Sequence, residues 1–210
     1  MLTLYYAPGT CALAPHIALV EAGAQYETVR LDLRTEDQKK PQYLRVNPKA
    51  RVPALMTEHG VLTETPAILY YIAQTHPAAK LAPSDPYWLG AAQAFNSYIC
   101  STLHVARGHR AAGHRWTDDP ATLEAMKRKV PQTVGECYAL IEGTMFLGPW
   151  VLGDYSICDA YLFTLTRGLA ADGVDVHATP NIADHFKRMS ERPAVQRAIA
   201  EETQPLQSAA

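Results

Sequence analysis

Residues 5–16 read Tyr5-Tyr6-Ala7-Pro8-Gly9-Thr10-Cys11-Ala12-Leu13-Ala14-Pro15-His16, and this segment joins the end of a strand to the start of a helix. The apolar run over residues 2–6 predicts the strand, the Pro-Gly pair a turn, and the helical spacing of apolar residues from Leu13 a helix that stops at Gly23. Cys11 would then lie at the helix N-terminus, where unpaired backbone N–H groups and the positive end of the helix dipole favour a thiolate. The same surroundings suit an anionic sulfur of a ligand. The ordinary alternative is a buried, inert cysteine.

Downstream of this helix, alternating apolar residues predict a second strand over residues 26–33, which would pair in parallel with the first through a right-handed crossover. Further strands are expected over 52–56 and 61–63, joined by a tight hairpin at His59-Gly60. Thr65-Pro66 is typical of an N-cap followed by proline and predicts a helix through Thr75. Residues 1–76 are therefore predicted to form a βαβ-ββα domain with a mixed, four-stranded sheet.

A change in composition predicts where this α/β domain ends. Pro77, Pro83 and Pro86 interrupt any helix and indicate a linker over residues 77–86. From residue 87 to 210, every periodic segment has helical spacing, which predicts an all-helical second domain. Ser156 and Asp159 form a capping-box pattern before one apolar helix of this domain.

Composition excludes several functional classes. A formal net charge of −2 gives no basic field for nucleic acid, and no apolar run approaches the roughly 20 residues that span a bilayer. The four cysteines form no CxxC pair and no zinc spacing, and the N-terminus has no export signal, so a reduced, cytoplasmic setting is expected. His104, His109 and His114 are five residues apart and fall on different helix faces, so no metal site is expected.

Four segments together resemble one family. They are the segment around Cys11, Asn47-Pro48-Lys49 with Val52-Pro53-Ala54-Leu55, Leu62-Thr63-Glu64-Thr65-Pro66-Ala67-Ile68, and the segment from Gly153 to Phe163. In this order, over nearly the whole chain, they are similar to the bacterial beta-class glutathione S-transferases. The resemblance implies a thioredoxin-like N-terminal domain, a helical C-terminal domain, a cytoplasmic homodimer with a role in detoxification, and glutathione as cosubstrate without a metal.

The resemblance also implies site residues. Cys11 would lie beside the glutathione sulfur, with Tyr6 nearby and His104 facing the pocket of the second substrate, a small hydrophobic electrophile. Glutathione would be bound by a larger set. Its members are Cys11, Arg51, Val52, Pro53, Glu64, Thr65, Ser97 and His104. Pro53 would be cis, so that the backbone of Val52 pairs with the cysteinyl unit of glutathione. Glu64 would bind the γ-glutamyl ammonium, and the helix start at Thr65 its carboxylate.

This sequence departs from the family pattern at several positions. Glu36-Asp37 stands where a lysine often binds the glycine carboxylate, leaving Arg34, Lys39 or Lys40 as substitutes. Another set of departures removes polar or charged side chains: Ala12 for serine, Ser97 for asparagine, and Val105 for lysine. Weaker glutathione affinity, or a narrower range of second substrates, is the expected result.

Three functions therefore remain open. The leading hypothesis is glutathione transfer to electrophiles. The second is thiol–disulfide exchange through Cys11, as in a one-cysteine glutaredoxin, which needs a single reactive thiol when glutathione supplies the other. The third is a non-catalytic dimer that binds glutathione or another ligand. Dehalogenase or isomerase chemistry on the same fold is not separable from conjugation in the sequence.

Overall fold

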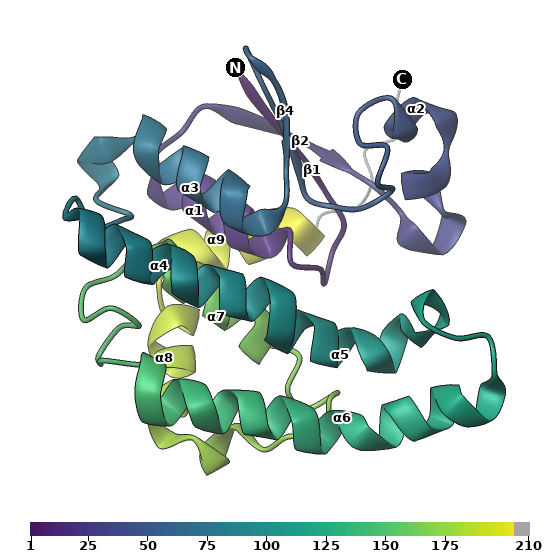
Figure 1. Ribbon diagram of the computed structural model, residues 1–210. Coiled ribbons are helices and arrows are strands. Elements are labelled where there is room, and N and C mark those ends of the chain that lie inside the picture. The colour runs from purple at the N-terminus through teal and green to yellow at the C-terminus, as the bar shows by residue number, and fades with distance from the viewer. Residues whose placement is uncertain (204–210) are drawn as a thin grey trace. The chain divides into compact units, whose positions relative to one another are not determined.

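A computed structural model describes residues 1–203 (Figure 1). The chain divides into two compact units. The first comprises residues 1–82 together with the chain from Met189 onward, and the second comprises residues 83–188. The expected C-terminal domain, 87–210, differs from these units at its far end, because the last helix packs against the first helix of the chain.

The first unit contains a mixed sheet in the order β2-β1-β3-β4. β1 pairs in parallel with β2, while β1 with β3 and β3 with β4 are antiparallel. The strands are β1 (Leu2–Tyr6), β2 (Tyr26–Arg30), β3 (Ala54–Thr57) and β4 (Gly60–Thr63). This arrangement is thioredoxin-like and confirms the predicted βαβ-ββα order. Two strands are shorter than predicted: β2 ends at Arg30, and β3 begins only after Pro53, which has no N–H for a sheet ladder.

Four helices belong to this unit: α1 (Leu13–Glu21), α2 (Pro41–Leu44), α3 (Thr65–Thr75) and α9 (Pro193–Thr203). α1 contacts both α3 and α9, and these three helices lie side by side in Figure 1. Apolar side chains of the sheet and helices form a buried core, among them Leu4, Ile17, Leu55, Ile68 and Ile72. The N-terminal residues therefore obtain part of their cover from the end of the chain.

The second unit is helical, as predicted. Its helices are α4 (Pro86–Tyr98), α5 (His104–Ala111), α6 (Pro120–Leu140), α7 (Ile157–Thr166) and α8 (Pro180–Ser190), the last of which runs past Arg188 into the first unit. A π-helical segment, Ile99–Leu103, joins α4 to α5, and α5 packs along α6 (Figure 1). All residues of α7 are buried, so this helix is the core of the unit. Within residues 1–203 no helix is long and apolar enough to cross a bilayer.

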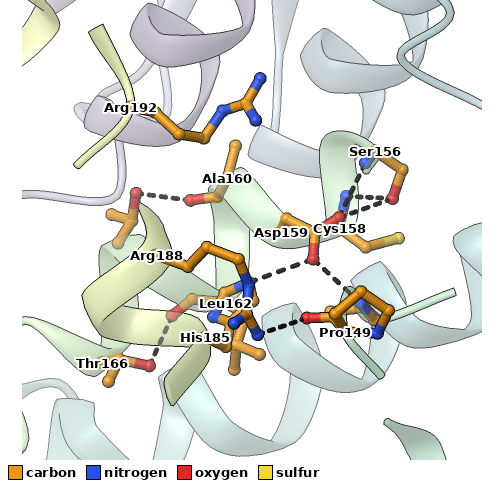
Figure 2. A network of polar contacts seen from close by, with 12 residues as sticks. Pro149, Ser156, Cys158, Asp159, Ala160, Leu162, Thr166, His185, Arg188 and Arg192 are labelled. Carbon is orange, nitrogen blue, oxygen red and sulfur yellow. Dashed lines mark hydrogen bonds and ion pairs between the residues drawn. The ribbon is translucent and has the colours of Figure 1, made fainter. Parts of the chain in front are cut away.

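The capping box predicted at the start of α7 is confirmed and is extended by further contacts. Asp159 accepts hydrogen bonds from the backbone N–H of Ser156 at 2.7 Å and of Val151 at 2.9 Å. The buried His185 of α8 lies 3.0 Å from the same carboxylate (Figure 2). One aspartate therefore caps α7 and also joins it to α8 and to the loop before it.

Candidate functional site

Cys11 lies in the turn between β1 and α1, two residues before the first helical residue, Leu13. The side chain is half-buried, and its thiol donates a weak hydrogen bond to the carbonyl oxygen of Val52 at 3.7 Å. The peptide bond between Val52 and Pro53 is cis. The structure therefore brings together the reactive-cysteine candidate and the proline segment, 41 residues apart in sequence.

The turn around Cys11 is fixed by its neighbours. Thr10 Oγ1 donates to the carbonyl of Ala7 at 2.7 Å and accepts from the N–H of Ala12 at 3.3 Å. The Gly9 N–H donates to Glu202 Oε1 at 3.0 Å, a contact with the last helix of the chain. Because Gly9 has a φ of +72°, the turn needs a residue without a side chain at this point.

The side-chain contacts of Tyr6 within residues 1–203 are made with residues other than Cys11. Its side chain is buried, and its hydroxyl donates to the backbone carbonyl of Glu201 in α9 at 3.4 Å. Burial raises the pKa of this hydroxyl, which keeps it protonated. The observed role of Tyr6 is to contact α9, and its catalytic role stays a prediction.

The segment before Pro53 is held by two side chains. Tyr43 and Asn47 both donate to the carbonyl oxygen of Arg51, at 2.6 Å and 2.7 Å. The Arg51 side chain itself is exposed. The Asn47 side chain thus fixes the backbone at Arg51, and in this way the Asn47-Pro48 motif orders the residues just before Val52.

Glu64 precedes α3 with an unusual backbone, φ 71° and ψ 122°. Its exposed carboxylate lies 2.5 Å from Lys49 Nζ, which also donates to Thr63 Oγ1 at 2.7 Å. The N-cap prediction was wrong by one residue: Glu64 is the N-cap, while the buried Thr65 is the first helical residue. The helix begins at Thr65, one residue earlier than the Thr-Pro pattern indicates, because it is Glu64 that has the non-helical dihedrals of an N-cap.

The three basic residues proposed as substitutes for a missing lysine all contact acidic neighbours. Arg34 pairs with Asp32 at 2.8 Å, Lys39 with Glu36 at 2.5 Å, and Lys40 with Asp37 at 2.6 Å. These pairs are largely exposed, and such pairs contribute only about 0–1 kcal/mol each. An anionic ligand could therefore recruit any of the three at little cost.

The remaining site candidates belong to the second unit. Ser97 is exposed near the end of α4, and the half-buried His104 begins α5 directly after the π-helical segment. One turn later, Arg107 and Arg110 both bind the fully buried carboxylate of Asp172. The positive charge of these two arginines is therefore partly neutralised, which the sequence did not indicate because Asp172 is 62 residues beyond Arg110.

A partly buried polar network beside the cysteine turn was missed by sequence reasoning. Glu201 of α9 accepts from His16 Nε2 and from the Tyr26 hydroxyl, both at 2.8 Å, and from Arg197 Nε at 2.7 Å. Burial lowers the pKa of His16 despite the nearby carboxylate. The pKa of Glu201 is also lowered: burial opposes the shift, but the hydrogen bonds from Arg197, Tyr26 and His16 outweigh it. A charge pattern on α9 alone could not have shown that this face turns inward.

Among residues 1–203, no group of three or more His, Cys, Asp or Glu side chains is arranged to hold a metal ion. The chemistry of the candidate site is that of a thiol at a helix start beside a backbone carbonyl. The helix start favours a thiolate, whereas the Val52 carbonyl accepts a hydrogen bond from the protonated thiol, and the segment before Pro53 can present backbone groups to an extended peptide.

The chain is similar to known proteins in both sequence and fold. Residues 1–74 match the family described as the N-terminal domain of glutathione S-transferase. A glutathione S-transferase of Escherichia coli O157:H7, GstA, is 34% identical over 95% of this chain and 98% of its own. A glutathione transferase homologue from Sulfitobacter, solved with bound glutathione, is 41% identical with a TM-score of 0.94, covering 97% of this chain and 99% of its own. A beta-class enzyme of Sphingomonas chungbukensis is 33% identical with a TM-score of 0.83, covering 96% and 98%.

Proposed function

The chain belongs to the glutathione S-transferase family, and we propose that it is a beta-class enzyme that conjugates glutathione to small hydrophobic electrophiles. The observation that carries the proposal is the contact between the Cys11 thiol and the Val52 carbonyl, beside a cis proline and at the start of α1. The similar Sulfitobacter structure contains glutathione, which supports the same ligand here.

In this proposal the cysteinyl unit of glutathione pairs with the Val52 backbone, as an added strand does. The helix start around Cys11 stabilises the glutathione thiolate and so raises the population of the nucleophile at neutral pH. The sulfur then attacks an electrophilic carbon: a C–S bond forms, the bond to the leaving group breaks, and the thiol proton passes to solvent. Ser97 and His104 are the proposed contacts of the second substrate.

Glu64 is the proposed partner of the γ-glutamyl ammonium, and the N–H groups at the start of α3, with the Thr65 hydroxyl, bind the neighbouring carboxylate. Lys49 already contacts Glu64, so the ligand's ammonium has to share or replace this lysine. Arg51 lies at the surface next to Val52, where it can approach the glycine end of the tripeptide.

Calorimetric titration with glutathione, followed by conjugation of 1-chloro-2,4-dinitrobenzene, tests the proposal. We expect millimolar or tighter binding and glutathione-dependent turnover that falls in Cys11→Ala. Cys100→Ala is the matched control, because Cys100 is also half-buried but belongs to the second unit and not to the β1–α1 turn. Tyr6→Phe separates a catalytic hydroxyl from a structural one. No binding by the folded protein at millimolar glutathione would instead favour a non-catalytic module.

A second function, thiol–disulfide exchange through Cys11, is favoured by the environments of the cysteines. Cys137 and Cys158 are buried, and burial raises the pKa of Cys158 far above its usual range, whereas Cys11 is partly accessible. In this reaction the Cys11 thiolate attacks the glutathione sulfur of a mixed disulfide, so that a Cys11–glutathione disulfide forms and the substrate thiolate leaves. The thiolate of a second glutathione then attacks this disulfide, which forms glutathione disulfide and restores the Cys11 thiolate. Intact mass with and without reductant should show a glutathione adduct that Cys11→Ala loses.

We also propose that the protein is a homodimer, as the family resemblance implies. Sedimentation equilibrium should give about twice the 23.1 kDa mass of the chain. A concentration-independent mass of one chain would contradict this proposal and leave the proposed chemistry to be tested on a monomer.

A further inference from the structure

The turn that carries Cys11 contains a backbone donor that binds the far end of the chain. The Gly9 N–H donates to Glu202 Oε1 at 3.0 Å, across 193 residues of sequence. Thr10 bonds only within the turn, and Cys11 itself donates to Val52. The hydrogen bond to Glu202 joins this turn to α9.

Glu202 is an unusual carboxylate, since it is only 2% exposed. Burying a carboxylate costs free energy unless hydrogen bonds compensate for the lost water, so its location is specific. A bond from a backbone N–H to a charged carboxylate is also stronger than a neutral one. The hydrogen bond between Gly9 and Glu202 is therefore a specific, partly buried contact.

The neighbouring residue fixes the helix that presents Glu202. Glu201 accepts hydrogen bonds from His16 in α1 and from Tyr26 in β2, and its backbone carbonyl accepts from Tyr6 at the end of β1. α9 is therefore held by three elements that surround the cysteine turn. Because α9 is held in place, Glu202 cannot move together with the turn. Its hydrogen bond to Gly9 therefore restrains the turn.

We propose that Glu202 is a positioning residue for Cys11: its carboxylate holds the Gly9 amide and so fixes the thiol relative to the Val52 carbonyl. The inference rests on the proposed function for its catalytic consequence, but the positioning itself does not. A misplacement of about 1 Å in a reacting group can cost on the order of 100-fold in rate, so one backbone contact is enough to affect turnover.

The test compares Glu202→Ala, Glu202→Gln and the control Glu191→Ala, which changes an exposed glutamate shortly before α9. The rate at which iodoacetamide alkylates Cys11, followed by peptide mass mapping, reports the thiol without any transferase reaction. We expect Glu202→Ala to change this rate and to lower kcat/KM for glutathione by about tenfold or more. In Glu202→Gln, which keeps an acceptor oxygen, the alkylation rate and kcat/KM should both stay within about threefold of the wild-type values. In Glu191→Ala, both should equal the wild-type values.

A second readout remains useful if Glu202→Ala unfolds. In the spectrum of ¹⁵N-labelled protein, the Gly9 amide proton should move upfield in Glu202→Gln, because the acceptor loses its charge. An unchanged Gly9 resonance, or wild-type alkylation in folded Glu202→Ala, would overturn the proposal. Equal loss in the alanine and glutamine variants would also overturn it. Full turnover in Cys11→Ala would reject Cys11 catalysis while leaving the alkylation result standing.

Discussion

Glu64 combines an exposed carboxylate with a backbone conformation that side chains rarely adopt. Its φ of 71° and ψ of 122° lie where glycine is preferred, at a cost of about 1–3 kcal/mol. Strained residues of this kind concentrate at ligand sites, where the surrounding structure holds them. The dihedrals of Glu64 are therefore consistent with the binding role proposed for its side chain.

Replacing Glu64 by glycine should separate stability from function. Glu64→Gly relieves the strain and should raise the free energy of unfolding by about 1 kcal/mol in urea titrations. Loss of the carboxylate should raise the KM for glutathione by about tenfold, equivalent to about 1.4 kcal/mol of binding.

Lys80→Gly is the matched control for this substitution. Lys80 is also exposed with a positive φ of 51°, but it lies in the connection after α3. It should gain stability without any change in KM. An unchanged KM in Glu64→Gly would remove Glu64 from the binding site.

At the residue scale, the sequence placed Cys11, Val52 and Glu64 in the α/β unit, because each lies next to a predicted strand or helix, and their binding roles stay predictions. It could not predict the partners of these residues. Lys49 reaches Glu64 through the conformation of the loop before Pro53, where Ala50 has a φ of 54°. Neither hydropathy nor spacing encodes such a loop conformation.

Secondary-structure elements were predicted with their order correct and their ends shifted. The period-2 pattern of residues 26–33 continued past the true end of β2, because Asp32 instead accepts a hydrogen bond from the Arg34 N–H and starts a 3₁₀ turn. The π-helical segment before His104 also has no signal in apolar spacing, since Ile99 and Leu103 are four residues apart as in an α-helix.

The cap of α7 should be worth much more than an ordinary cap. Asp159→Ala leaves the N–H groups of Val151, Ser156 and His185 without their buried acceptor (Figure 2), and should lower the free energy of unfolding by about 3 kcal/mol. Asp119→Ala removes an exposed cap at the start of α6 and should cost about 1 kcal/mol. Equal losses in urea titrations would show that the contacts beyond the helix end contribute nothing.

The contact between α1 and α9 should weaken in mild acid. The folded-state pKa of His16 is lowered by burial, so the unfolded chain binds a proton first as the pH falls through about 6.5. Stability is therefore present above that pH and lost below it, because burial outweighs Glu201 and Glu202, which raise the pKa of His16, while Arg197 lowers it further. Between about pH 7 and pH 5, the free energy of unfolding should fall by up to about 1 kcal/mol more in the wild type than in His16→Gln.

The control for this pH dependence is His59→Gln, since His59 is exposed in the β3–β4 hairpin. Its slope of unfolding free energy against pH should equal that of the wild type. Equal slopes of unfolding free energy against pH in the wild type, His16→Gln and His59→Gln would show that proton binding by His16 is not linked to folding.

For the whole molecule, composition and proline spacing predicted an α/β unit followed by helices. They did not predict that α9 packs against α1 in the first unit. Val195, Ala198 and Glu202 form the buried face of α9, and an amphipathic helix fits equally well on a helical bundle or on α1. Contacts such as the pairing of Glu201 with His16 decide between these options. That pairing lies 185 residues apart in sequence, beyond any local pattern.

A fragment that stops where the sequence suggests a domain end should not be stable. Residues 1–82 lack α9, which leaves the buried face of α1 and His16 exposed. We expect no cooperative urea transition by circular dichroism for this fragment. A permuted chain that links residues 189–210 ahead of residue 1 should restore it. A cooperative transition in the plain fragment would show that α9 is dispensable for folding.

The position of α9 at the end of the chain has a consequence for biosynthesis. Translation delivers the amino end first, so Cys11 leaves the ribosome long before Glu201 and Glu202 are made. We expect the nascent thiol to remain in a mobile turn until α9 has been made. A chain that is terminated or cleaved before α9 would carry a sulfur that is present but unaligned, so synthesis of α9 serves as a check on activity.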